Sequence, residues 1–168
     1  MGIIASLGRL LLSTIFILAA WHKIEDFGSD GGSAMKAMEP KLALFRNHVA
    51  AALDVALPQV ETDNTIFDNF VVNLQAKYML MTAIALEGVG GILFFFGSSL
   101  GAYLLLIFLA SVTPIMHDFY NYDMSSSNYS REFIQFLKNL SLFGSLMFYL
   151  GMKSAAYKQE KRVKAKAS

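Results

Sequence analysis

The carboxylate Glu87 has the clearest capacity for chemistry in this sequence, because it lies near the middle of a long apolar stretch. A carboxylate at the centre of a membrane-spanning helix costs about 2.5 to 3.5 kcal/mol, so such residues usually face the bundle interior and have a partner. Ala83, Gly90 and Gly91 share its helical face and would let another helix approach closely. Two interpretations stay open: a carboxyl that joins helices, or a group that binds a ligand or transfers a proton.

Further polar side chains gather near one end of the apolar stretches. The candidate pocket residues, besides Glu87, are His22, Lys23, Thr113, His117, Asp118 and Asn139. They could line a cavity open to one side of the membrane, with Glu87 and His117 as candidate catalytic residues. The ordinary alternative is that lysines reach to the interface and that each histidine is structural. A metal site of His22, His117 and Asp118 has no recognisable ligand spacing, so no metal is predicted.

The elements that must position these residues are apolar helices. The chain has 168 residues, of which 55% are hydrophobic and 16% charged, whereas soluble domains have about 25% charged residues. Four stretches approach the ~20 residues that cross a bilayer, and backbone groups in hydrocarbon must be bonded internally. We therefore predict an all-α fold, a four-helix transmembrane bundle within residues 1–152. Its helices are expected over about 3–22, 77–97, 100–119 and 133–152.

The long first loop contains a helix of another kind. Pro40 stands where a helix would begin. Apolar residues then recur at helical spacing: Leu42, Phe45, Val49, Leu53 and Ala56. Lys41 lies on the opposite, polar face, and Pro58 ends the pattern. This predicts an amphipathic helix over about 40–57, which either lies on the membrane surface or caps the bundle. The second placement, in which the helix caps the bundle, is favoured.

Charge is distributed unevenly and predicts an orientation. Residues 153–168 form a basic tail with six cations and one acid, Glu160, whereas residues 25–68 are acidic. Four crossings place both ends on one side, and the positive-inside bias assigns that side to the cytosol. The net charge of +1 gives no reason to expect a nucleic-acid partner. A cleaved signal peptide at the start is disfavoured, because Arg9 interrupts the apolar run and no charged region precedes it.

Enzyme motifs are missing from the sequence. There is no nucleophile elbow, phosphate loop, zinc-protease helix or dinucleotide fingerprint. The chain has no cysteine, which excludes disulfides and thiolate chemistry. If the protein is an enzyme, its chemistry has to take place within the helices, so a non-enzymatic role is favoured.

Short segments over nearly the whole chain resemble one known family. They are Leu7-Gly8-Arg9, Asp30-Gly31-Gly32, Gly90-Gly91, Phe96-Gly97-Ser98-Ser99, Gly101-Ala102-Tyr103, Phe119-Tyr120-Asn121-Tyr122-Asp123 and Lys138-Asn139-Leu140-Ser141. In these the chain resembles the plant HR-like lesion-inducing proteins, within the wider DoxX-like membrane superfamily. The resemblance implies a four-helix bundle and an association with hypersensitive-type cell death, without an established biochemical activity.

The superfamily implies two kinds of function. Some bacterial members look like quinone-linked thiosulfate oxidoreductase subunits, and some eukaryotic members are cargo receptors or receptor-assembly chaperones of the endoplasmic reticulum. The chain ends in Lys164-Ala165-Lys166-Ala167-Ser168, which is similar to a KxKxx retrieval signal. Our first hypothesis is therefore a non-enzymatic escort or scaffold of the endoplasmic reticulum with a membrane-protein partner. The alternative is a redox subunit using Glu87 and His117, which requires a cavity that admits a quinone to Glu87. Lipid or ion passage has little support.

Overall fold

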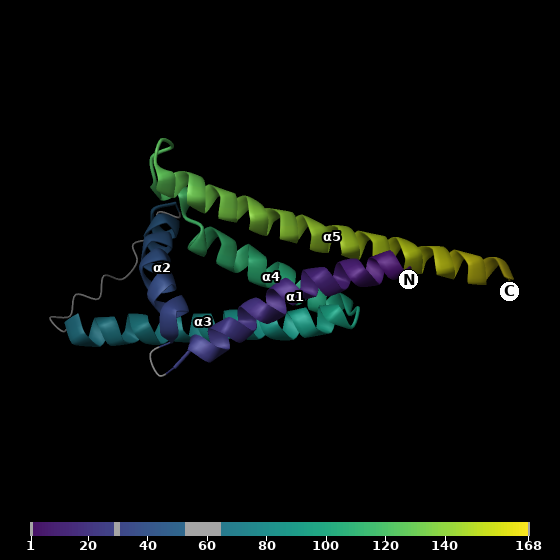
Figure 1. The fold of residues 1–168 in the computed structure, drawn as a ribbon, viewed down its shortest axis with the longest axis horizontal. Coiled ribbons are helices and arrows are strands. Elements are labelled where there is room, and N and C mark those ends of the chain that lie inside the picture. Colours follow the sequence, from purple (N-terminus) through teal and green to yellow (C-terminus); the bar gives the residue numbers. More distant parts are fainter. Residues whose placement is uncertain (1, 29–30, 53–64, 168) are drawn as a thin grey trace.

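The protein is all-helical, with no strand in the part that the structure describes (Figure 1). A computed structural model describes residues 2–28, 31–52 and 65–167. The helices are α1 (Ile3–Asp26), α2 (Gly32–Ala52), α3 (Thr65–Phe95), α4 (Ser99–Met116) and α5 (Ser127–Ala167), with a short 3-10 turn, η1 (Phe119–Asn121). Four of them contain segments long and apolar enough to cross a membrane, over 3–26, 76–95, 99–121 and 127–166. These findings confirm the all-α class and the four candidate spans.

The four spanning helices pack in the order α1, α3, α4 and α5. The main core takes residues from all four: Phe16, Phe94, Ala102, Leu105, Phe108, Leu109 and Leu146. The α4 span is 39% buried, whereas only 6% of the α5 span is buried. Helix α4 is therefore central and α5 peripheral, and a hollow lies between the outer helices α1 and α5.

Glycines allow the inner helices to approach one another closely. A Cβ atom on Gly101 of α4 would lie 2.3 Å from the backbone nitrogen of Phe94 in α3. A Cβ on Gly91 would lie 3.0 Å from the Ile17 side chain of α1. The close approach predicted on the Glu87 face of α3 is thus confirmed, and it brings Glu87 within reach of neighbouring helices.

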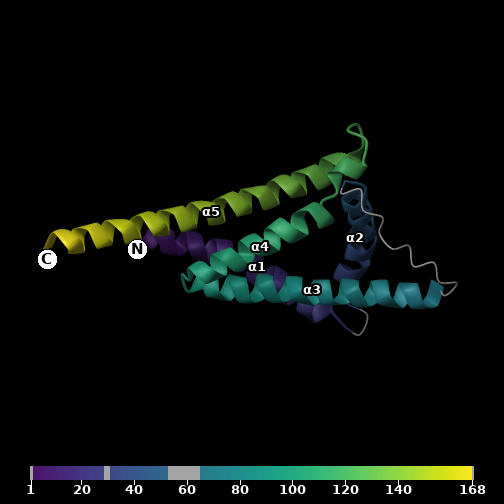
Figure 2. The same cartoon turned by 180° about the vertical axis from the view of Figure 1, so that it is seen from behind.

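Helix α2 covers one end of the bundle. It runs across the other helices at the end away from both termini, as both views show (Figures 1 and 2). Met35 and Met38 are buried there against Ala76, Leu80 and Ile84 of α3. Of the two placements that the sequence left open, the structure shows the cap. We call this end the capped end, and the end with the N-terminus and the α3–α4 turn the open end.

The predicted start of α2 was wrong. The helix begins at Gly32, and Pro40 lies inside it. Gly32, the first residue of α2, has a φ of 68°, and the Asp26 carboxylate at the end of α1 accepts a 2.5 Å hydrogen bond from the Ser33 N–H. This capped turn starts the helix early, although Pro40 removes one internal bond. Residues 53–57 of the predicted helix lie outside the described part.

Two helices are longer than their apolar segments. Helix α3 begins at Thr65 and not near residue 77, and α5 continues through the basic tail to Ala167. A 2.6 Å ion pair between Lys164 and Glu160, one turn apart, supports the helical tail. Hydropathy predicts only the apolar part of a helix that can lie in the membrane, and these two helices continue beyond that part.

Candidate functional site

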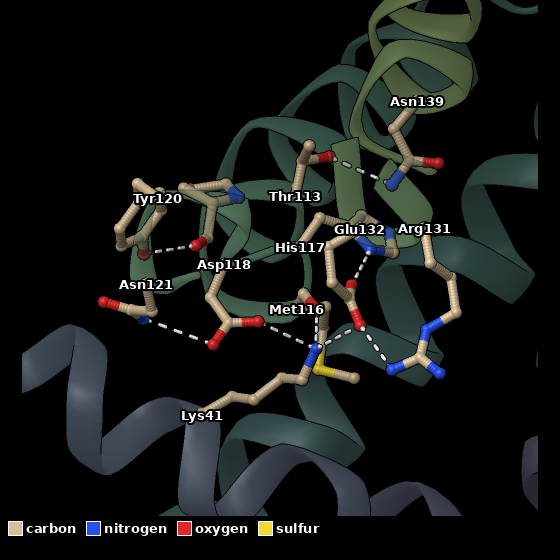
Figure 3. A network of polar contacts seen from close by, with 11 residues as sticks. Lys41, Thr113, Met116, His117, Asp118, Tyr120, Asn121, Arg131, Glu132 and Asn139 are labelled. Carbon is tan, nitrogen blue, oxygen red and sulfur yellow. Dashed lines mark hydrogen bonds and ion pairs between the residues drawn. The ribbon is translucent and has the colours of Figure 1, made fainter. Parts of the chain in front are cut away.

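The predicted site residues fall into two groups. The first, the membrane pair, consists of Lys23 on α1 and Glu87 on α3. The second, the cap cluster, lies where α2 meets the end of α4 and the start of α5. It comprises Lys41, Thr113, His117, Asp118, Asn121, Glu132 and Asn139 (Figure 3).

In the membrane pair, Lys23 is the partner that the position of Glu87 requires. Glu87 is only 4% exposed, and Lys23 Nζ donates a 2.5 Å hydrogen bond to its Oε2. The same ammonium lies 5.5 Å from the ring centroid of Phe108 on α4, within reach of a cation–π interaction. The pair therefore links α1 to α3 and contacts α4. Loss of either member would leave an uncompensated charge in a mostly buried place.

The cap cluster is centred on one cation from α2. Lys41 Nζ lies 2.9 Å from Asp118 Oδ1 and 3.1 Å from Glu132 Oε1. It also donates a 2.6 Å hydrogen bond to the carbonyl of Met116 at the end of α4 (Figure 3). Asp118 is 2% exposed, so this interaction is well shielded from water. A single lysine thus fixes α2 to both α4 and α5.

Lys41 was predicted on the polar face of this helix, and its ammonium contacts buried carboxylates of the bundle. A long, flexible stem lets the ammonium reach a polar partner away from its own Cα. Burial by itself lowers the pKa of Lys41, but the hydrogen bonds and charges of Asp118 and Glu132 outweigh it and raise the pKa above the ordinary lysine value. Lys41 consequently stays charged at neutral pH and holds both carboxylates.

The structure brings four predicted residues together along the α4–α5 seam. His117 Nδ1 lies 3.2 Å from Glu132 Oε2, and Asn139 donates a 3.2 Å hydrogen bond to the Thr113 hydroxyl. Asp118 accepts a 3.2 Å hydrogen bond from Asn121 as well as its contact with Lys41. The first two contacts join α5 to α4 or to the residue that follows it. The contact between Asp118 and Asn121 closes the connection after α4.

Three members of the cluster, Lys41, Asn121 and Glu132, were not predicted. Glu132 lies in the first part of α5, just after the short connection that follows His117. An acid and a histidine at the two ends of a short connection between antiparallel helices are placed to meet, and this signal could have found Glu132. Nothing comparable pointed to Lys41, since its contact depends on how α2 lies across the bundle.

His22 is separate from the other candidates. Its side chain is 78% exposed, and its charged neighbour is Glu25 on the same helix, at 3.8 Å. Within the described ranges, no three His, Asp or Glu side chains are grouped so that they could hold a metal ion. The metal site considered from His22, His117 and Asp118 does not form in this part of the chain.

The hollows of the described bundle do not reach the membrane pair. One of about 320 Å³ lies between α3 and α4 beside α2, one of about 450 Å³ between α1 and α3, and one of about 520 Å³ between α1 and α5. Neither Glu87 nor Lys23 lines any of the three. A quinone-linked reaction at Glu87 requires an opening to this carboxylate, and none of these three hollows provides it.

Four candidate spans, a helical cap and charges that join helices define a small polytopic membrane protein. The family model described as HR-like lesion-inducing matches residues 1–152, and the chain belongs to that family. The match covers α1 to α4 and the apolar part of α5, and it ends before the basic end of α5. Comparisons with curated proteins and with solved structures give no significant match.

Proposed function

We propose that this family member is a non-enzymatic membrane protein of the endoplasmic reticulum that scaffolds or escorts other membrane proteins. One observation carries the proposal: the charged groups of the candidate site are paired with one another between helices. Lys23 joins α1 to α3, Lys41 joins α2 to α4 and α5, and Glu132 joins α5 to His117. Groups held in this way stabilise an arrangement of helices, which is what a binding scaffold requires.

Helix α5 offers the surface on which we expect a membrane-protein partner to bind. With 6% of its span buried, it presents most of its apolar side chains outward. Ile134, Leu137 and Leu140 are among its exposed large residues, at 52%, 42% and 52%. A peripheral helix of this kind can pack against a helix of another protein without disturbing the α1–α3–α4 core.

The location and orientation are part of the proposal. Both termini lie at the open end (Figure 1), as an even number of crossings requires. Lys164 and Lys166 are exposed at the end of α5, where a cytosolic retrieval receptor would find them. The basic tail supports a cytosolic open end. Membership of the DoxX-like superfamily and an association with hypersensitive-type cell death are proposed on the resemblance alone.

The retrieval signal can be tested by Lys164→Ser with Lys166→Ser in a tagged full-length chain. We expect the variant to leave the endoplasmic reticulum, whereas Lys158→Ser with Lys161→Ser, which removes the same charge upstream, stays. An unchanged location of the first variant would refute retrieval.

The scaffold proposal is tested by cross-linking and copurification from native membranes. We expect the wild-type chain to retain a stable membrane-protein partner. Lys41→Met should release it, because α2 is no longer fixed to α4 and α5. Lys158→Met, an equal change at an exposed site on α5, should keep it. The proposal would be contradicted if the wild-type chain purified without a partner. It would also be contradicted if the Lys41→Met chain retained its partner as the wild type does.

A further inference from the structure

The hollow between α1 and α5 at the open end has a composition unlike the other two. Its volume is about 520 Å³, within the range of ligand sites. Leu12, Phe94 and Phe148 form an apolar inner part, and Gly2 and Ala5 lie at its outer part. Between these parts, Arg9 from α1 and Lys153 from α5 line the hollow from opposite walls. It therefore combines an apolar slot with two cations.

Both cations lack an acidic partner among the described residues. Arg9 Nε is buried without a hydrogen-bond partner, and its Nη2 donates a 3.3 Å hydrogen bond to the Ser6 hydroxyl. Lys153 Nζ donates a 2.6 Å hydrogen bond to the carbonyl of Gly97 in the α3–α4 turn. The sequence has no Asp or Glu in 2–24, 88–117 or 133–159, so no carboxylate from these segments can neutralise them. Two positive charges thus face an apolar slot with no internal counter-charge.

We propose that this hollow binds one anionic phospholipid. Its phosphate lies between Arg9 and Lys153, and one acyl chain follows Leu12, Phe94 and Phe148 toward the membrane centre. A guanidinium with a free N–H donates well to phosphate oxygens, and an ammonium adds a second charge-assisted hydrogen bond. The polar headgroup then points toward Gly2 and Ala5, where small side chains leave room.

Charge favours a lipid over a protein helix as the occupant. A partner helix, or a second copy of this chain, would have to bring a carboxylate to the hollow to match the two cations, and acids within a membrane are rare and costly. A phospholipid supplies its phosphate at the depth of the headgroups. Beyond Lys153, α5 exposes Lys158, Lys161 and Arg162, and such basic flanks concentrate anionic lipids at the membrane surface.

The test uses the purified full-length chain and native mass spectrometry with phosphatidylglycerol and phosphatidylcholine of identical acyl chains. We expect one phosphatidylglycerol to be retained per chain in preference to phosphatidylcholine. Arg9→Gln with Lys153→Gln should weaken its binding about 25-fold, since each cation near a membrane surface contributes about fivefold. Lys158→Gln with Lys161→Gln is the matched control, because it removes equal charge outside the hollow and should change binding only slightly.

A second, steric variant is needed because Lys153→Gln also removes the hydrogen bond that Lys153 makes to the α3–α4 turn. A Cβ on Gly8, which lines the hollow, would meet nothing within 4 Å, so Gly8→Leu fills the slot and leaves both cations in place. It should abolish retention of phosphatidylglycerol while the helical content is unchanged. Equal retention of both lipids, or equal loss in the matched control, would overturn the proposal. So would a Gly8→Leu chain that keeps its lipid but loses a dimer, because the occupant would then be a second copy.

Discussion

The two ends of the bundle use charge in different ways. At the capped end, Lys41 meets Asp118 and Glu132, and the Lys23–Glu87 pair lies on the same side of the core. At the open end, Arg9 and Lys153 contact hydroxyl, carbonyl and apolar groups, and neither has an acidic partner among the described residues. The charges at the capped end therefore maintain the fold, whereas those at the open end are available to a ligand.

Replacing Glu87 with Gln should cause the largest loss of stability. Lys23 would keep its charge without a counter-charge in a mostly buried site, and breaking a fully buried pair costs about 3 to 5 kcal/mol. Because the Lys23 side chain is 31% exposed, we expect about 2 to 3 kcal/mol after allowing for solvent screening. The measurement is the free energy of unfolding in mixed micelles. Glu25→Gln removes an exposed carboxylate of α1 and should change it by less than about 0.5 kcal/mol. Equal effects of the two would show that Glu87 does not hold the helices.

Lys41→Met should release the cap with a smaller loss of global stability. Asp118 and Glu132 would lose their cation, but Asp118 keeps the hydrogen bond from Asn121 and Glu132 keeps its contact with His117. We expect a cost of about 1 to 2 kcal/mol. Hydrogen exchange should become faster in α2 around Met35 and Met38, while α4 stays protected. Protection of α2 that survives the substitution would mean that apolar packing alone holds the cap.

Arg9→Gln should change stability by less than about 1 kcal/mol in lipid-free detergent, because no carboxylate loses a partner there and the hydrogen bond to Ser6 is long. The same unfolding measurement checks this value. A loss as large as that of Glu87→Gln would show that the open end is also held by its charges, and the contrast between the ends would fail.

Docking of the cap should be insensitive to pH near neutrality. Burial lowers the pKa of Lys41, but the hydrogen bonds and charges of Asp118 and Glu132 outweigh it and raise the pKa above the ordinary lysine value. A group whose pKa is raised on folding contributes its full stability below the unfolded pKa and loses it as pH rises through the folded pKa. Exchange protection of α2 should therefore stay constant between about pH 7 and 9 and fall only in stronger alkali. Loss of protection between pH 7 and 9 would rule out Lys41 as the group responsible.

The sequence predicted the spans well and the cap poorly, for physical reasons. Burial in hydrocarbon imposes continuous apolar stretches, so the four spans could be read from hydropathy alone. The start of α2 depended on a Gly32 turn capped by Asp26, which is a local contact that the helical periodicity after Pro40 does not reveal. The helical tail of α5 was missed because a basic segment can remain helical outside the membrane.

The sequence predicted several members of the candidate site, but not the contacts between them. A partner for Glu87 could be expected from the cost of burying a carboxylate, and Lys23 was already a candidate. That the two meet depends on how α1 and α3 pack, across 64 residues of sequence. Lys41 was missed because helical periodicity placed it on the polar face, and only the crossing of α2 over the bundle brings its ammonium to Asp118.

The charges at the capped end join the helices that meet there. The most direct test is a double-mutant cycle on Lys41→Met and Asp118→Asn, with the free energy of unfolding measured for all four proteins in mixed micelles. If Lys41 and Asp118 together hold α2 to the bundle, the double variant should lose less than the sum of the single variants, with a coupling of at least about 1 kcal/mol. Strictly additive losses would contradict it, because the two residues would then act independently and the cap cluster would not hold α2 to the bundle.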